Sequence, residues 1–418
     1  MPITNSIPAA ARNVASQLSS SLKFRKLLVV IKQTAYEEYS QLRLRGQAPK
    51  ALRWQRLENR YKAHKTTVND LMGILRHHNV EFTCVNRVEL DRQHLAHVDL
   101  MLAVGGDGTV LSAAHFLDHG TIPLLGINSD PSKEQEKDTK QKTDERRSHG
   151  ALCMCTSLNM ADNIEKVLAG CGKVQSRTRI QCTVKSTFTE TQIVPALNDI
   201  LIANPSPAAV SRFRMGFLEQ VQDEDDGTHH PLVDDRMNYI PSSVTDPMDM
   251  NGASKASEQI NVRPPTMDSS APMDGTARLT HQNVKLFNKQ YGTVTRFGGI
   301  AYDIRDSLNI WSSGMWVCTA TGSTAAMNAA GGMPMQDLGS TDIQYKIREH
   351  IYEKGQPVNK ERDNAFVHYD EQLHLRWNSQ HGSIFVDGSH LTHDLVLGDE
   401  ILINGRAPPL TLFVADDK

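Results

Sequence analysis

The first part of the chain is built from short apolar blocks that favour an α/β fold. Leu27–Ile31 is a continuous apolar run, which is typical of a strand buried on both faces. Val68–His77 carries apolar residues at helical spacing, and Val80–Val85 predicts a second strand. Another apolar run, Val98–Val104, precedes a helical stripe at Val110–Leu117. Because strands and helices alternate in this order, the pattern predicts a parallel sheet.

The rest of the chain favours strands over helices. Met160–Leu168 predicts one more helix, whereas 180–188 and 193–203 have the composition of strands. Leu308–Cys318 predicts a strand that leads through small residues into an alanine-rich helix. Near the end, short apolar runs separated by turns predict antiparallel sheets; these runs are 373–377, 383–389, 395–397, 400–403 and 410–414.

Three polar segments interrupt this pattern. Residues 219–283 are rich in acids, Ser, Met, Pro and His, and they bury too little to offset their ordering entropy, so they predict a long loop-like insertion. Lys133–Arg147 is nearly all charged or polar and predicts a solvated helix or a disordered loop. Residues 1–25 contain no acid but several basic residues among Ser and Ala. They predict either a flexible extension or a short transit peptide, so a cytoplasmic location and import into mitochondria or another organelle both stay open.

Composition restricts the class of protein. The 418 residues suggest two domains plus insertions, and 39% of them are hydrophobic, which is enough for a core. A net charge of −3 gives no reason to expect nucleic acid or an anionic membrane as a partner. No apolar run approaches the length that spans a bilayer. The six cysteines are scattered, with no second pair at zinc spacing, and predict buried free thiols rather than a metal site.

The stretch with the most chemical content is Val104–Thr109, Val-Gly-Gly-Asp-Gly-Thr, which joins a strand to the helix after it. Its three glycines let the backbone approach a bulky group, and N–H groups at a helix start form an anion site. Asp107, in the middle, could accept a hydroxyl proton or help to hold a phosphate-bound metal. The glycine spacing matches neither a P-loop nor a dinucleotide fingerprint. Taken alone, the stretch fits a purely structural turn as well as a catalytic one.

Two further stretches place polar or small residues where apolar ones are expected. Asn198 and Asp199 interrupt an apolar run, and burying them without partners would cost about 1–3 kcal/mol each. Their partner is either a neighbouring turn, which we favour, or a ligand. Thr319–Ala326 consists of small residues that let a second backbone or a planar ligand approach closely. Within it, Ser323 and Thr324 can cap the helix that follows.

The order of these motifs resembles that of the NAD kinases: Gly-Gly-Asp-Gly-Thr, Asn-Asp in an apolar strand, Thr-Gly-Ser-Thr-Ala, and a late Asp387–Gly388 that also fits a hairpin turn. The first motif is shared with lipid kinases and phosphofructokinases, whereas Thr-Gly-Ser-Thr-Ala is far more particular to NAD kinases. The resemblance covers roughly residues 26–213 and 300–415. It is closest to the plant NADH kinase branch, through the stretches 127–131, 196–203, 207–213 and 322–327.

The resemblance implies a fold of the α/β plus all-β class. An N-terminal doubly wound α/β domain would occupy 26–155, and a β-sandwich-like, dinucleotide-binding domain would occupy 156–390. The second domain would contain a disordered insert at about 214–299, and strands within 391–418 would pack back towards the first domain. The substrates would lie in the cleft between the two domains.

The resemblance also implies transfer of the ATP γ-phosphate to the 2′-hydroxyl of the adenosine ribose of NAD or NADH. Asp107 would be the general base, and the donor phosphates would be cradled by Gly105, Gly106, Gly108 and Thr109. The dinucleotide would be bound by Asn198, Asp199, Gly322, Ser323, Thr324 and Ala325. Such enzymes are usually homo-oligomers that need a divalent metal. We therefore expect a homodimer that uses ATP and Mg²⁺, although no set of metal ligands is evident in the sequence.

Two positions depart from the pattern of the family. Ala326 stands where a Tyr commonly follows Thr-Gly-Ser-Thr-Ala, and Ser313–Gly314 stands where Asp-Gly is common. Both changes also occur in the NADH kinase branch and make NADH a plausible preferred acceptor. One alternative is a lipid kinase of the same loop class, but the chain has no basic membrane patch to support it. The other is a non-catalytic NAD(H)-binding sensor, against which the intact glycine turn with Asp107 argues.

Overall fold

The computed structural model describes residues 22–131, 148–221, 294–352 and 360–416. Our expectations for residues 1–21, 133–147 and 222–293 fall outside these residues. The insert expected at about 214–299 was drawn too wide, because 214–220 and 294–297 belong to strands. The chain on both sides of the long insertion, Met1–Glu219 and Thr295–Lys418, belongs to one compact unit. Within the described residues, no helix combines the length and the apolar character that crossing a membrane requires.

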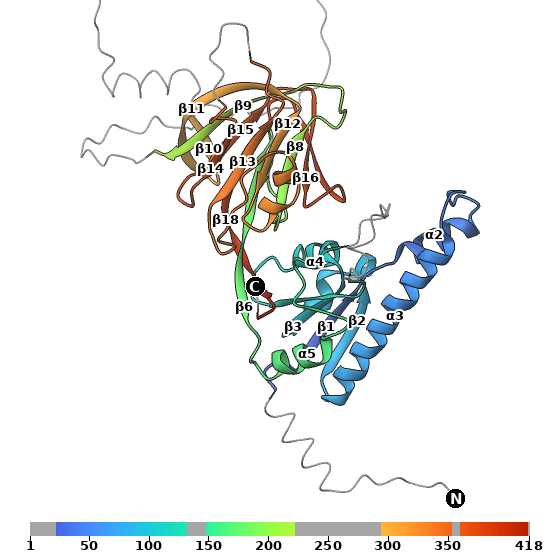
Figure 1. Cartoon of the computed structure of the whole chain (residues 1–418). Helices are drawn as coiled ribbons and strands as arrows, with labels where there is room; N and C mark the ends of the chain where they lie inside the picture. Colours follow the sequence, from blue (N-terminus) through green and yellow to red (C-terminus); the bar gives the residue numbers. More distant parts are fainter. Residues whose placement is uncertain (1–21, 132–147, 222–293, 353–359, 417–418) are drawn as a thin grey trace, which may run out of the picture. The chain divides into compact units, whose positions relative to one another are not determined.

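The first region of this unit is a parallel sheet, as the alternating pattern predicted (Figure 1). Its strands pair in the order β4-β3-β1-β2, and a short β5 adds to β4. The strands are β1 (Lys26–Ile31), β2 (Glu81–Asn86), β3 (Leu100–Gly105), β4 (Leu124–Asn128) and β5 (Cys155–Thr156). The helices are α2 (Ala35–Leu44), α3 (Trp54–His77), α4 (Asp107–Ala114) and α5 (Met160–Leu168).

Helices cover both faces of this parallel sheet. Alternate residues of a strand point to opposite faces. Leu27 and Val29 of β1 pack in the same core cluster as residues of α3 and α5. Leu28 and Val30 pack instead with residues of α4. The sheet is therefore doubly wound, and the continuous apolar run that predicted β3 is explained by burial of that strand at every position.

The second region is made of antiparallel strands, in agreement with the short apolar runs of the sequence. One group continues the first sheet beyond β4 in the order β18-β15-β9-β11-β10, and a separate sheet has the order β14-β13-β12-β8-β16-β17. Its strands are β6 (Val174–Lys185), β7 (Glu190–Gln192), β8 (Asp199–Ala203), β9 (Ser211–Gln220), β10 (Val294–Phe297), β11 (Ile300–Ser312), β12 (Gly314–Cys318), β13 (Ile343–Arg348), β14 (Asn364–Val367), β15 (Leu373–Trp377), β16 (His381–Val386), β17 (Leu391–Val396) and β18 (Glu400–Phe413). Trp377, fully buried, stacks on Phe213 at 6.1 Å between ring centroids and lies in the core of this region.

The long strand β18 connects the two regions. It pairs antiparallel with β6 and β15, and its Leu412 pairs in parallel with Leu124 of β4. Leu410, Leu412 and Val414 lie in the same core cluster as residues of α4. The apolar face of α4, the helix that follows the glycine turn, is thus packed by residues from near the end of the chain.

Several elements differ from their predictions. The strand predicted at 193–203 begins only at Asp199, since Pro195 has no N–H for a ladder and Ala196 makes a single bridge to Ile180. The run 308–318 is divided into β11 and β12 at Ser313.

The alanine-rich helix is also shorter than its sequence suggests. It spans only Ala326–Ala329 as α7 and follows a 3-10 turn at Gly322–Thr324. Capping by Ser323 and Thr324 was a wrong prediction, because the N-cap of α7 is Ala325 and no side chain caps it.

Candidate functional site

The glycine turn connects the end of β3 to the start of α4. Gly105 is the last residue of β3, and α4 begins at Asp107. A Cβ on Gly106 would collide with the side chain of Ser148, so the tight approach of the 148–152 loop requires glycine there. Gly108, by contrast, is exposed with open space around it. The start of α4 therefore faces solvent at Gly108, while the two preceding glycines are packed against protein.

Asp107 is held by the 148–152 loop. Its carboxylate accepts hydrogen bonds from Ser148 Oγ at 2.8 Å, Gly150 N at 3.1 Å and Leu152 N at 2.8 Å. A carboxylate offers about four acceptor positions. About one position is left for another donor. No sequence pattern pointed to Ser148, Gly150 and Leu152, because they follow a polar segment and lie more than forty residues from Asp107; Ser148, for example, is separated from it by 41 residues.

The Asn198–Asp199 and Thr319–Ala326 stretches, which are far apart in the sequence, lie against each other. Thr319 donates from its backbone N to Asn198 O at 2.9 Å and from its hydroxyl to Leu197 O at 2.6 Å. A Cβ on Gly322 would collide with the backbone of Asn198, so this position also requires glycine. The small residues of the stretch thus allow a second backbone to approach, which was one of the two interpretations open from the sequence.

The four residues at the centre of that stretch differ in how accessible they are. Gly322 and Ser323 are buried. The Ser323 hydroxyl donates to Ala320 O at 2.8 Å and accepts from Met335 N at 2.9 Å, so its hydrogen bonds are made inside the protein. Thr324 and Ala325 are exposed. Any direct contact with a ligand is therefore easier for Thr324 and Ala325 than for the two residues before them.

Asp387 organises the backbone of the Asn198–Asp199 stretch. Its carboxylate accepts hydrogen bonds from Leu197 N at 2.9 Å, Asn198 N at 2.7 Å and Asp199 N at 3.0 Å. The same carboxylate lies 2.7 Å from Nε2 of His115, at the end of α4. We call this set of contacts, made by Asp387 with His115 and the three N–H groups of 197–199, the Asp387 junction. It is buried, and through it the β16–β17 hairpin turn meets the backbone of residues 198–199; it satisfies their N–H groups and not their side chains.

Helix α4 joins the two groups of predicted site residues. Asp107 is its first residue and His115 follows its last. At a rise of 1.5 Å per residue, these two positions are about 12 Å apart along the helix. The structure therefore gathers Gly105–Thr109 with the 148–152 loop at one end of α4, and Asn198–Asp199 with the Thr319–Ala326 stretch beside the Asp387 junction at the other. Sequence reasoning missed His115 and the buried role of Asp387, for which an Asp-Gly hairpin turn was a sufficient explanation.

Asp199 has an unusual protonation behaviour for a carboxyl group. Burial, together with the negative charge of Asp387, raises the pKa of Asp199 to about 7. Within the described ranges, no hydrogen bond reaches its carboxylate. Nearby, burial and the charge of Asp199 raise the pKa of the Cys318 thiol to about 12, which keeps that thiol protonated. A partly neutral Asp199 can both donate and accept hydrogen bonds near neutral pH.

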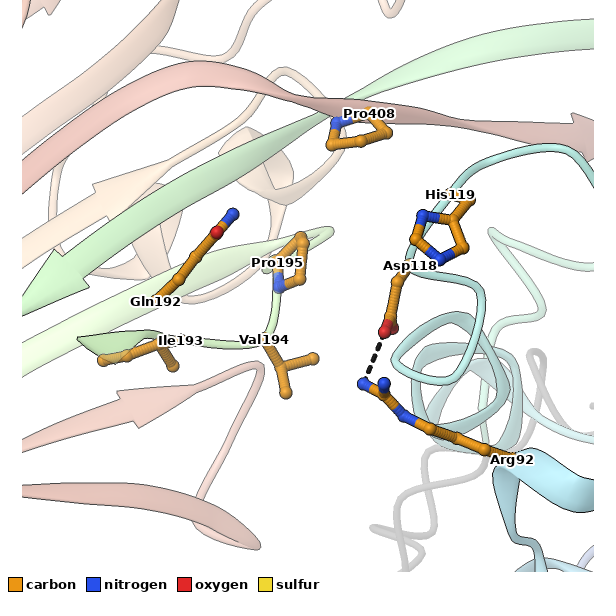
Figure 2. Close-up of a pocket in the computed structure, with 8 residues that line it drawn as sticks. All are labelled: Arg92, Asp118, His119, Gln192, Ile193, Val194, Pro195 and Pro408. Atoms are coloured by element: carbon orange, nitrogen blue, oxygen red, sulfur yellow. Dashed lines mark ion pairs between the residues drawn. The ribbon is translucent and has the colours of Figure 1, made fainter. Parts of the chain in front are cut away.

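Of two cavities compared for their distance from the predicted site residues, only one adjoins these residues. The cavity in Figure 2, of about 310 Å³, is lined by Arg92, Asp118, His119, Gln192–Pro195 and Pro408. An ion pair between Arg92 and Asp118 borders it, and none of the predicted site residues lines it. A second cavity, of about 770 Å³, is lined by Trp316, Ala326, Glu349 and neighbouring residues of β13. This second cavity adjoins the Thr319–Ala326 stretch and is therefore the one that we connect with the site.

Comparison with known proteins gives consistent results. Residues 3–130 match the family model described as ATP-NAD kinase N-terminal domain. The chain is 30% identical over 403 residues to the NADH kinase of Arabidopsis thaliana, covering 94% of this chain and 97% of that protein. It is 28% identical over 375 residues to the probable NADH kinase of Oryza sativa subsp. japonica, covering 90% of this chain and 88% of that protein. The crystal structure of yeast NADH kinase complexed with NADH aligns with a TM-score of 0.51 at 12% identity, over 95% of this chain and 85% of that one, which confirms the fold class.

We predict that Asp199 makes the stability of the protein fall as the pH rises. Its folded-state pKa of about 7 lies above its ordinary value of 3.8, so between these values the folded state holds a proton that the unfolded state releases. The resulting stabilisation is complete below the lower value and is lost as the pH rises through the upper one. Asp199→Asn should remove this dependence. The free energy of unfolding of the variant, measured by urea denaturation, should rise relative to wild type by about 3 kcal/mol between about pH 5 and pH 9.

The matched control for this measurement is Asp370→Asn, in an exposed turn. Its stability should run parallel to that of the wild type across the same pH range. If the curve of Asp199→Asn also runs parallel to wild type, the raised pKa of Asp199 is wrong.

Proposed function

Because the chain belongs to the NAD kinase family, we propose that it transfers the γ-phosphate of ATP to the 2′-hydroxyl of the adenosine ribose of NADH or NAD. The products would be ADP with NADPH or NADP. The observation that carries this proposal is the arrangement around α4. A glycine turn with an acid lies at the start of the helix, and the Asn198–Asp199 and Thr319–Ala326 stretches are joined to its end through the Asp387 junction.

Phosphoryl transfer depends mainly on positioning and charge neutralisation, with little covalent chemistry for the protein to supply. The donor phosphates would lie at the start of α4, where N–H groups and the helix dipole favour negative charge. Gly108 keeps this start open to the phosphates, whereas Gly105 and Gly106 let Thr109 and the 148–152 loop pack closely and so shape the turn that would cradle them.

Asp107 would act as the general base. The 2′-oxygen attacks the γ-phosphorus, the bond from that phosphorus to the β,γ-bridging oxygen breaks, and ADP leaves with the bond electrons. The proton of the 2′-hydroxyl passes to the Asp107 carboxylate, which keeps about one acceptor position free. The three hydrogen bonds from the 148–152 loop would hold the carboxylate in a fixed orientation for this transfer.

The adenosine half of the dinucleotide would lie against Asn198, Asp199, Thr324 and Ala325. Asn198 is half-buried, and Asp199 can donate as well as accept a hydrogen bond near neutral pH. Gly322 and Ser323 would support this surface from behind, because both are buried and Ser323 makes its hydrogen bonds within the protein. Their contribution would be to position Thr324 and Ala325.

A divalent metal would enter with the donor. The described residues contain no group of three or more His, Cys, Asp or Glu side chains able to hold a metal ion. This fits Mg²⁺, which binds through substrate phosphates with only one or two carboxylates. Because the last free position of Asp107 is assigned to the hydroxyl proton, the ion would be held mainly by the donor phosphates, whose charge it would neutralise. We further propose that the chain acts as a homodimer. Its location would be the cytoplasm or, where the acid-poor N-terminus serves import, mitochondria or another organelle.

Asp107→Asn should lower turnover by at least about a hundredfold, because the amide cannot take up the proton. The affinity for NADH should stay within severalfold of wild type. Formation of NADPH from ATP and NADH gives the turnover, and calorimetric titration with NADH gives the affinity. Ser148→Ala serves as the comparison, since it removes one hydrogen bond to Asp107 and keeps the carboxylate. It should lower turnover far less; near-normal turnover of Asp107→Asn would exclude the proposed base.

The two departures from the family pattern border one cavity. Ala326 lines it, and Ser313 donates a hydrogen bond to Glu349, which also lines it. The nicotinamide ring is cationic in NAD and neutral in NADH. Trp316 and Glu349 already line the cavity; a further aromatic ring at 326 and a further carboxylate at 313 would favour the cation more strongly, and this chain has neither at the two positions. We therefore propose NADH as the preferred acceptor.

The ratio of kcat/KM for NADH to kcat/KM for NAD should exceed one for the wild-type protein. Ala326→Tyr should reduce this ratio by about fivefold to tenfold, because the added ring offers its face to the cationic nicotinamide. Steady-state kinetics with each acceptor measures the effect. Ala161→Tyr, at an exposed position of α5, is the control and should leave the ratio unchanged. A wild-type preference for NAD, or a ratio indifferent to Ala326→Tyr, would refute the assignment.

A further inference from the structure

Lys32 lies beside the glycine turn, although it is far from the turn in sequence. It follows the last residue of β1, and its backbone N donates to Val104 O at 3.0 Å. A Cβ on Gly105 would lie 3.0 Å from Cβ of Lys32. The lysine side chain therefore leaves the sheet at the carboxyl ends of its parallel strands, next to the residues that start α4. In open α/β sheets this edge is where ligands bind.

In the described part of the chain, two arginines and one aspartate act on the charge of Lys32. Arg60 on α3 and Arg87 after β2 are close enough to lower the pKa of Lys32, in addition to the larger effect of partial burial. Asp130 is the negative group that opposes them, and it also lies 3.6 Å from Arg60. Within residues 22–131, 148–221, 294–352 and 360–416, no carboxylate comes within 4.0 Å of the Lys32 ammonium. The Lys32 side chain nevertheless reaches solvent, so an anion can approach it.

The residues packed near Lys32 include a buried, uncharged histidine. His64 of α3 is buried, and its Nδ1 lies 2.8 Å from Ser129 Oγ. Burial, together with the charge of Lys32, lowers the pKa of His64 to about 4, so this ring is neutral at physiological pH. Ser129 in turn donates from its backbone N to Gly105 O at 2.9 Å. These contacts connect α3, the end of β4 and the glycine turn, and among the described residues Lys32 is a cation placed directly beside the turn.

We propose that Lys32 binds the terminal phosphates of the ATP donor and positions them at the glycine turn. The assignment rests on the proposed kinase function, and it adds a residue that no sequence motif indicated. A lysine ammonium is a compact point charge with three donors, which suits a flexible triphosphate. Because Asp107 is only two residues beyond Gly105, a phosphate held by Lys32 at the turn is the one closest to the proposed base.

The test is equilibrium binding of a non-hydrolysable ATP analogue, AMP-PNP with Mg²⁺, to the full chain by calorimetric titration. Lys32→Gln should weaken AMP-PNP binding by about tenfold or more, as expected for loss of a hydrogen bond between charged groups. Binding of AMP, which lacks the β- and γ-phosphates, should change by less than about twofold. Lys32→Arg should retain most of the AMP-PNP affinity, and NADH affinity should be unchanged in both variants.

Lys26→Gln is the matched control, since Lys26 is exposed at the opposite end of the same strand. It removes the same charge and should bind AMP-PNP like the wild type. The assignment of Lys32 is overturned if Lys32→Gln binds AMP-PNP as the control does. It is equally overturned if Lys32→Gln loses AMP-PNP and NADH affinity together with thermal stability, because that outcome indicates a structural role. A wild-type protein that binds AMP-PNP but forms neither NADPH nor NADP would refute the proposed function and leave the phosphate contact standing.

Discussion

Three consecutive backbone N–H groups, those of residues 197–199, meet one buried carboxylate, that of Asp387. A buried charge of this kind is costly unless hydrogen bonds and an opposite or polar partner satisfy it. His115, at the end of α4, supplies the remaining contact at 2.7 Å. The Asp387 junction thus fixes the distance between a hairpin of the antiparallel region, the start of β8 and the helix that carries the glycine turn. The placement of every proposed dinucleotide contact relative to α4 depends on it.

The rest of the site follows from how α4 is held at its two ends. At its start, the 148–152 loop closes over Gly106 and orients the Asp107 carboxylate. At its end, the Asp387 junction and the apolar residues of β18 hold it against the second region. A phosphate donor and a dinucleotide acceptor can then be aligned by one short, rigid element. Alignment of this kind is the main contribution that a protein makes to phosphoryl transfer.

The pattern of apolar and polar residues was sufficient to predict the strands and helices of the first region. The continuous apolar run of β3 and the helical stripes are each formed by residues close together in the sequence. The pattern was also sufficient for the glycine turn and its acid. It failed where distant segments decide the structure. Ser323 and Thr324 have the composition of helix caps, yet the helix starts after them because Gly322 must pack against Asn198. His115 and Asp387 are 272 residues apart in the sequence, and hydrophobic periodicity cannot predict a contact over that separation. In the sequence, Lys32 is only a lysine that follows a strand; its position beside Gly105 is seen only in the folded structure.

The central claim is that the adenosine ribose accepts the phosphate, and the position of the transferred group tests it most directly. The protein would be incubated with NADH, Mg²⁺ and ATP labelled in its γ-phosphate, and the labelled dinucleotide would be located by phosphorus NMR and mass spectrometry. We expect one label for each product molecule, on the 2′-oxygen of the adenosine ribose. Label on any other hydroxyl, or ATP consumed without label in the dinucleotide, would contradict the claim.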